Sequence, residues 1–177
     1  QIPLDPSYGS ENVGLYIRKS YKGGWCYVVK GKEGKQFKKG CTADVNSLYP
    51  SVMSSESGCI YPYGEPHFWK GAIPQEAIGK NKYYFVRFKC RFYIKEGMLP
   101  FVQIKSSFLY KATEALETSD VYDKKTNKYY KFLRDIEGNI IPTTVELTMT
   151  CTDWALFNEH YNIEELEILD GCWFYAG

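Results

Sequence analysis

Alternation of apolar and polar positions is the dominant pattern along this chain, and it predicts a protein built largely from β-strands. Residues 82–95 (KYYFVRFKCRFYIK) alternate apolar with basic side chains over the length of one long strand, buried on one face and wet on the other. Residues 98–104 predict a strand that returns beside it, and residues 163–175 predict a closing strand. An aromatic content of 17%, with 16 tyrosines, also favours strands.

The amino-terminal quarter contains a pair of glycines between two shorter apolar runs. Residues 14–20 and 25–29 are predicted to be strands, and residues 21–24 (YKGG) are predicted to be the turn between them, because paired glycines supply the positive φ that tight turns require. Residues 30–39 (KGKEGKQFKK) are strongly basic, which favours a solvated hairpin loop. Contact with phosphate groups is the alternative for this basic run.

Helical patterns lie in the second half of the chain. Residues 107–118 combine helical spacing with strong helix formers. Thr150, followed three residues later by Asp153, has the spacing of a capping box and predicts a helix that begins there.

A polar segment and a glycine turn precede the predicted capping box. Residues 123–128 are typical of a turn, and residues 129–133 and 140–150 are predicted to form a hairpin around a second turn at 137–139. The chain is therefore predicted to have an α+β fold, with a strand-rich antiparallel sheet and few helices.

One apolar run, residues 40–53 (GCTADVNSLYPSVM), contains a single carboxylate. Residues 41–46 predict a strand, Ser47 can cap the helix that follows, and Pro50 is tolerated in the first turn of that helix. Asp44 would then lie near a strand end that faces a helix N-terminus, where a carboxylate can hold a divalent cation and free N–H groups can bind phosphate. A turn residue at the end of a strand is the commoner explanation for such an aspartate.

Composition and charge limit the classes of function only weakly. The 177 residues are 44% hydrophobic, which is enough for the packed core of one domain. The net charge of +1 gives no argument for nucleic acid, although basic residues can still cluster locally. No stretch is long and apolar enough to predict a membrane span, so no membrane partner is expected.

Cysteine and histidine spacing does not predict a structural zinc site. The six cysteines lie far apart without a C-x-x-C pair, and the two histidines are distant from each other. Several cysteines lie in apolar runs, as buried free thiols of a reducing, cytosolic compartment do. The chain begins at Gln1 without a methionine, which suggests an excised fragment.

The segment around Asp44 resembles a polymerase motif. Residues 44–51 (DVNSLYPS) resemble motif A, D-x-x-S-L-Y-P-S, of family B DNA polymerases, and residues 21–24 resemble the Y-x-G-G motif of its protein-primed branch, which phages and linear plasmids use. Residues 61–66 (YPYGEP), 96–105 (EGMLPFVQIK) and 158–161 (NEHY) resemble the insertion of that branch called terminal protein region 1. The resemblance covers nearly the whole chain.

The resemblance implies an organisation and a function. Residues 1–55 would be an amino-terminal palm segment with both motifs, and residues 56–177 would be the terminal protein region 1 insertion, a small α+β subdomain. The full-length parent would be a DNA-directed DNA polymerase of a phage, plasmid or other mobile element, acting in the bacterial host cytoplasm. Its partners would be primer-template DNA, deoxynucleoside triphosphates and a terminal protein that primes synthesis, and its cofactor would be Mg²⁺ or Mn²⁺.

The resemblance also implies roles for individual residues. Asp44 would be catalytic and would bind the metals through its carboxylate, and Val45 would bind them through its backbone carbonyl. Ser47 and Leu48 would present backbone groups to the triphosphate, and Tyr49 would stack under the incoming sugar and exclude a ribose 2′-hydroxyl.

The remaining implied contacts involve DNA and the terminal protein. Tyr21, Gly23 and Gly24 would touch the primer-template duplex, Lys105 would contact DNA, and Asp153 would contact the terminal protein. A solvated strand end explains Lys105 equally well, and the capping box by itself explains Asp153. The expected electrostatic footprint for DNA consists of Lys105 and of three basic residues on the wet face of the long strand, Arg87, Lys89 and Arg91.

Two motifs of the family are absent from the sequence. Neither motif C (Y-x-D-T-D-S), which carries the partner carboxylate, nor motif B (K-x-x-x-N-S-x-Y-G) occurs in these 177 residues. Two-metal phosphoryl transfer needs carboxylates around a metal pair about 3.5–4 Å apart, so the chain alone is expected to be inactive. The alternative is a non-catalytic module that binds terminal protein or DNA. A metal-dependent nuclease would need further clustered carboxylates, and none stand out.

Overall fold

The computed structural model describes residues 13–24, 28–29, 31–102, 121–123, 128–130, 133–134, 137, 140–141 and 145–177. The helices are α1 (Val13–Arg18), α2 (Leu48–Met53) and α3 (Cys151–His160), and 3-10 turns lie at Ser55–Ser57 and Gln75–Ala77. The strands are β1 (Pro62–Lys70), β2 (Lys82–Ile94), β3 (Val121–Asp123), β4 (Lys128–Tyr130), β5 (Leu133–Arg134), β6 (Ile140–Ile141), β7 (Val145–Thr150) and β8 (Tyr161–Ala176). Within the described part of the chain, no helix is long and apolar enough to cross a membrane.

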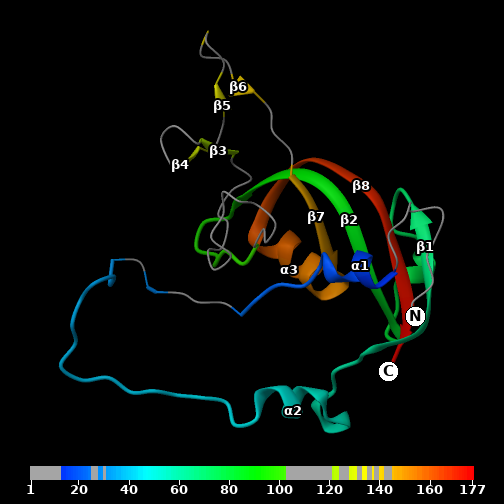
Figure 1. The fold of residues 1–177 in the computed structure, drawn as a ribbon, viewed down its shortest axis with the longest axis horizontal. Coiled ribbons are helices and arrows are strands. Elements are labelled where there is room, and N and C mark those ends of the chain that lie inside the picture. The colour runs from blue at the N-terminus through cyan, green and yellow to red at the C-terminus, as the bar shows by residue number, and fades with distance from the viewer. Residues whose placement is uncertain are drawn as a thin grey trace.

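Four antiparallel strands form the central sheet, in the order β1-β8-β2-β7. The two longest strands, β2 and β8, pair along nearly their whole length, from Lys82 opposite Tyr175 to Ile94 opposite Tyr161. Figure 1 shows β7, β2 and β8 arching over helix α3. The strands predicted at 82–95 and 163–175 are therefore confirmed, and so is the α+β fold class.

The face of the sheet beneath this arch buries the main hydrophobic core. Alternate residues of β2, namely Val86, Phe88, Cys90 and Phe92, are each at most 1% exposed and share one face because side chains alternate along a strand. Phe157 of α3 packs against this row, with its ring centroid 5.6 Å from that of Phe88 and 5.4 Å from that of Phe92. Burying one side chain of this size stabilises a fold by about 2 kcal/mol.

Helix α1 covers part of the opposite face of the sheet. Val13 and Tyr16 are three residues apart, so they lie on the same side of the helix, and both are buried against Phe85, Cys172 and Phe174. The strand predicted at residues 14–20 is therefore wrong: residues 13–18 are helical and end in a turn. This short apolar run fits either period, and packing onto the sheet decided in favour of the helix.

Gly171 of β8 leaves room for the Trp69 ring of β1 and for the Phe85 carbonyl of β2. A Cβ atom built on Gly171 of β8 would lie 2.2 Å from atoms of the Trp69 ring and 2.5 Å from the carbonyl oxygen of Phe85. No larger residue fits at this position without moving backbone, because real Cβ atoms do not approach other atoms so closely. Gly171 therefore leaves the space that the Trp69 ring occupies.

Residues 98–101 do not form the predicted return strand, and Val102 makes only an isolated bridge. Both edges of β2 are already paired, with β8 on one side and β7 on the other, so no edge is left for another strand. The backbone N–H groups of Phe101 and Val102 instead donate to the Tyr161 hydroxyl, at 3.0 and 3.3 Å. Residues 103–104 lie outside the described residues.

The segment before β7 contains two small hairpins. Strand β3 pairs with β4, closing the polar turn with Asp123 opposite Lys128, and β5 pairs with β6 on either side of the predicted turn at 137–139. The predicted hairpin is confirmed only next to its turn, where β5 pairs with β6. Residues 129–130 pair with β3 instead, and β7 starts at Val145 in another sheet. The helix predicted at 107–118 lies outside the described residues.

Candidate functional site

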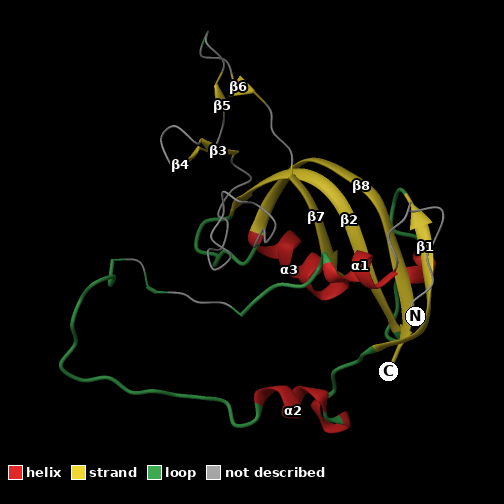
Figure 2. Ribbon diagram, in the orientation of Figure 1, coloured by secondary structure: helices red, strands yellow, loops and turns green. Residues whose placement is uncertain are grey.

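The segment with the lone carboxylate forms an exposed arm that leads into helix α2. Residues 40–45 adopt no regular structure, so the strand predicted at 41–46 is wrong. A strand needs backbone partners on a neighbouring strand, and no described residue pairs with this segment. Figure 2 shows the arm running away from the sheet before α2 begins. The predicted helix after Ser47 is confirmed.

Ser47, at the start of α2, has a left-handed backbone with φ 50° and ψ 48°. For a residue other than glycine this conformation costs about 1–2 kcal/mol. Its side chain makes no capping hydrogen bond, so the predicted capping role is wrong, whereas its carbonyl accepts from Ser51 N at 2.9 Å. Strained backbone is commonly found where a chain meets a ligand. The strained residue, Ser47, is one that the resemblance to motif A predicts to contact the triphosphate.

Helix α2 is apolar and has no buried residue. Tyr49 is 75% exposed, Met53 is 70% exposed, and Leu48 and Val52 are also exposed. Apolar side chains gathered on one short exposed helix mark a surface that other protein covers. Tyr49 is the most exposed of these apolar side chains.

Asp44 and Val45 provide hard oxygen donors of the kind that Mg²⁺ and Mn²⁺ prefer. Both residues are exposed, and a carboxylate followed by a backbone carbonyl fits one side of a divalent metal site. Among the described residues, no group of three or more His, Cys, Asp or Glu side chains is placed to hold a metal ion. The donor set therefore fits half of a metal site and needs further carboxylates to complete it.

The Y-x-G-G segment follows directly from the end of helix α1. The amide of Tyr21 donates to the Arg18 carbonyl at 3.0 Å, and the hydroxyl of Ser20 donates to the Ile17 carbonyl at 2.6 Å. Residues 21–24 therefore continue as irregular chain after a helix end, and the predicted turn between two strands is wrong. Residues 28–29 form no strand, and residues 25–27 lie outside the described residues.

The fold does not require glycine at position 24. Gly24 does not have a positive φ, and a Cβ atom built on it would meet no atom within 4 Å. Among the residues that the structure describes, Gly24 therefore serves no positive-φ turn and no close packing.

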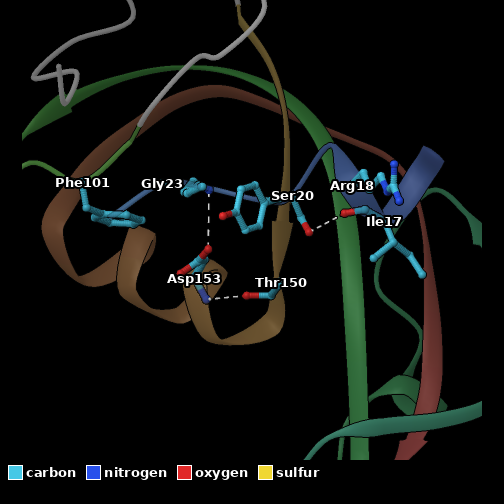
Figure 3. Close-up of a pocket in the computed structure, with 9 residues that line it drawn as sticks. Ile17, Arg18, Ser20, Gly23, Phe101, Thr150 and Asp153 are labelled. Atoms are coloured by element: carbon cyan, nitrogen blue, oxygen red, sulfur yellow. Dashed lines mark hydrogen bonds and ion pairs between the residues drawn. The ribbon is translucent and has the colours of Figure 1, made fainter. Parts of the chain in front are cut away.

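A pocket of about 710 Å³ lies between the Y-x-G-G segment and the N-terminus of α3 (Figure 3). Lys22 Nζ lies 3.5 Å from Asp153 Oδ2 and 6.0 Å from the centre of the Phe101 ring. The Thr150 hydroxyl accepts from Asp153 N at 3.2 Å, which confirms the predicted cap of α3. The pocket is lined by Ile17, Arg18, Ser20, Tyr21, Lys22, Gly23, Phe101, Thr150 and Asp153.

The structure thus brings together some of the predicted site residues. Tyr21 and Gly23 share the pocket with Asp153, whereas no residue of motif A lines it. Lys105 lies outside the described residues. Sequence reasoning missed Lys22 and Phe101, and the only available signal for Lys22 was its position inside the Y-x-G-G motif.

Two of the three β2 residues expected to contact DNA, Arg87 and Arg91, are paired with carboxylates. Arg87 Nε donates to Asp170 at 2.9 Å and its Nη1 donates to Glu146 at 3.1 Å. These bonds, chiefly those to Asp170, raise the pKa of Arg87 above its ordinary value. Arg91 Nη1 lies 3.6 Å from Glu165, and only Lys89 is exposed. Both arginines therefore already pair with carboxylates, and the electrostatic footprint for DNA on this strand stays a prediction.

Comparison with known proteins identifies polymerase relatives. The family described as DNA polymerase type B, organellar and viral, matches residues 5–167. The chain is 32% identical to the DNA polymerase of Bacillus phage Nf over 155 residues, which make up 88% of this chain and 23% of that polymerase. It is 30% identical to the DNA polymerase of Bacillus phage phi29 over 162 residues, 90% of this chain and 23% of the relative.

A solved polymerase structure has the same fold. Phi29 DNA polymerase in a ternary complex with primer-template DNA and incoming nucleotide substrates matches with a TM-score of 0.69 at 29% identity, over 94% of this chain and 25% of that one. The chain thus spans about a quarter of the length of these relatives. The matched region contains the motif A residues, which favours a polymerase segment over a stand-alone binding module. The family match covers residues 5–167, most of the chain, and the fold agrees with that of a solved polymerase. The chain therefore belongs to the organellar and viral type B DNA polymerases.

Proposed function

We propose that this chain supplies the first metal-binding carboxylate, the nucleotide-binding helix start and the terminal protein region 1 insertion of a protein-primed DNA polymerase. The observation that carries the proposal is the arm at residues 44–51, where an exposed carboxylate precedes a strained Ser47 and an uncovered helix. The remainder of the polymerase would cover the apolar surface of α2 and bring further carboxylates to Asp44.

Asp44 and Val45 would hold the divalent cation of the nucleotidyl transfer reaction. Bound Mg²⁺ or Mn²⁺ supplies positive charge to the triphosphate and to the attacking 3′-hydroxyl. The chain's own contribution is to place the Asp44 carboxylate and the Val45 carbonyl on adjacent residues of an exposed loop, where both oxygens can face the same ion.

The start of α2 would bind the incoming nucleotide. The left-handed Ser47 turns the chain so that the first backbone N–H groups of α2, which have no partners within the helix, are available to the triphosphate. Tyr49 would lie under the deoxyribose, where its ring leaves no room for a 2′-hydroxyl.

The two remaining surfaces would bind DNA and the priming protein. The phi29 polymerase structure contains primer-template DNA and nucleotides, and the corresponding DNA contacts in this chain would be Tyr21, Gly23, Gly24 and Lys105. Asp153 and the insertion would contact the terminal protein, whose hydroxyl accepts the first nucleotide. Synthesis would take place in the cytoplasm of a bacterial host.

Replacing Asp44 by alanine in the full-length polymerase tests this function. Synthesis should fall by about 10³-fold or more while binding of a primer-template duplex stays within about twofold, because the carboxylate acts through metal and not through the duplex. Glu56→Ala, which removes an exposed carboxylate just beyond α2, is the matched control and should retain synthesis. Equal activity of the two variants would overturn the proposal.

A further inference from the structure

Lys22 lies inside the Y-x-G-G segment, and its side chain is only 12% exposed. A lysine is seldom buried to this extent without an opposite charge, because removing an ammonium group from water is costly. The opposite charge here is Asp153, whose Oδ2 lies 3.5 Å from Lys22 Nζ.

Asp153 is available for this pairing because its helix cap does not need its side chain. The Thr150 hydroxyl accepts from the backbone amide of Asp153, and α3 runs a full ten residues from Cys151 to His160. The carboxylate of Asp153 is 30% exposed and lies in the first turn of α3, where the helix dipole favours a negative charge. Asp153 is therefore a fixed anchor on the insertion side of the pocket.

We propose that Asp153 is a positioning residue for DNA binding: by balancing the charge of the largely enclosed Lys22, it lets the Y-x-G-G segment pack against the insertion. Tyr21 and Gly23 are the direct neighbours of Lys22, so each lies one Cα–Cα step of about 3.8 Å from the anchored residue. The DNA contacts assigned to these neighbours rest on the proposed function. The ion pair itself joins a residue of the palm segment to a residue of the insertion.

The pairing predicts an asymmetry between its two members. Asp153→Asn leaves an ammonium group buried without its carboxylate, so Lys22 should leave the pocket and displace residues 20–24. Lys22→Met keeps an apolar stem beside Phe101 and removes the buried charge, so the segment should stay in place. The double variant has neither charge and should also stay in place.

Hydrogen exchange of the 177-residue chain tests the positioning directly. Asp153→Asn should raise exchange at residues 20–24 by about tenfold, whereas Lys22→Met and the double variant should stay within about threefold of the wild type. Glu146→Gln, which removes the partner of a different ion pair on the sheet, is the matched control and should not change residues 20–24. Unchanged exchange in Asp153→Asn, or an equal rise throughout β2, would overturn the proposal.

Binding of a fluorescently labelled primer-template duplex supplies a readout that distinguishes positioning from simple charge. If only net charge mattered, Asp153→Asn would bind DNA more tightly and Lys22→Met more weakly. If Asp153 instead positions the segment, Asp153→Asn should bind the duplex about fivefold more weakly than the wild type, despite its added positive charge. The double variant should regain the affinity that Asp153→Asn loses. Tighter binding by Asp153→Asn would overturn the proposal. Absence of duplex binding in the wild type would instead count against the DNA contacts of the proposed function, and hydrogen exchange would still decide the role of Asp153.

Discussion

The hydroxyl of Tyr16 in helix α1 donates a 2.7 Å hydrogen bond to Oδ1 of Asp170 in β8, across 154 positions of the sequence. Asp170 is only 4% exposed and also accepts from Arg87. This buried network joins the amino-terminal segment to the sheet, so the predicted palm and insertion segments share one packed interface.

Replacing Tyr16 by phenylalanine should destabilise the chain by about 1–2 kcal/mol. The ring would still fill its site, but the buried carboxylate would lose one of its donors, and hydrogen bonds to charged groups are stronger than neutral ones. Urea denaturation measures the change. Tyr63→Phe, at an exposed tyrosine, should have no effect. Equal stability of the two variants would mean that the bond to Asp170 contributes nothing net.

The same hydrogen bond predicts sensitivity to alkaline pH. Burial, reinforced by the bond to Asp170, raises the pKa of Tyr16 above its ordinary value. Because the folded-state pKa exceeds the unfolded one, the contribution of Tyr16 is complete below about pH 10 and is lost as the pH rises above it. The wild type should therefore lose stability more steeply than Tyr16→Phe when denaturation is measured at increasing pH above 10. Parallel pH profiles would contradict this.

Two glycines should respond in opposite ways to replacement by alanine. Gly171→Ala should destabilise the fold by about 2–3 kcal/mol, because its Cβ atom would collide with Trp69 and with the Phe85 carbonyl. Gly24→Ala meets no atom and should leave stability unchanged, yet it should weaken binding of a primer-template duplex if DNA approaches the backbone there. Thermal unfolding measures the stability of both variants, and fluorescence anisotropy measures the binding of the duplex to Gly24→Ala. Unaltered DNA affinity in Gly24→Ala would remove that residue from the interface.

Four of the cysteines should separate into two reactivity classes. Cys41 and Cys59 are exposed, whereas Cys90 and Cys172 are buried, and burial raises the pKa of each buried thiol to about 12. Alkylation at pH 8, mapped by mass spectrometry, should modify the exposed pair more than about 100-fold faster, because the thiolate is the reactive form and the buried sulfurs are inaccessible. Comparable rates in the native chain would show that the sheet opens readily.

Replacing Tyr49 by valine in the full-length polymerase should relax sugar selection. The smaller side chain leaves room for a 2′-hydroxyl, so ribonucleotide incorporation should rise by about tenfold or more while deoxynucleotide use changes little. Single-nucleotide incorporation with matched ribo- and deoxyribonucleotides measures the ratio, and Tyr63→Val is the control outside the motif. A ribo-to-deoxy ratio equal to that of the wild type would remove Tyr49 from this role.

Local patterns in the amino-acid sequence were sufficient to predict the long strands β2 and β8 and the capped helix α3, and to identify the motif around Asp44. Each depends on residues that are neighbours in sequence: an alternation of period two, a hydroxyl three residues before an amide, or a contiguous string of motif positions. Apolar surroundings predict several buried thiols without saying which, and of the described cysteines Cys90 and Cys172 are buried whereas Cys41 and Cys59 are exposed.

Contacts between distant parts of the chain decided the rest. Residues 14–20 suit a strand or a helix equally, and they became helix α1 because Tyr16 reaches Asp170 on the sheet. Residues 41–46 have the composition of a strand but no strand beside them among the described residues. The pairing of Lys22 with Asp153 and the neutralisation of Arg87 by Asp170 have no local signature either. Periodicity is a property of neighbouring residues, whereas strand partners, ion pairs and buried faces depend on which distant segments meet.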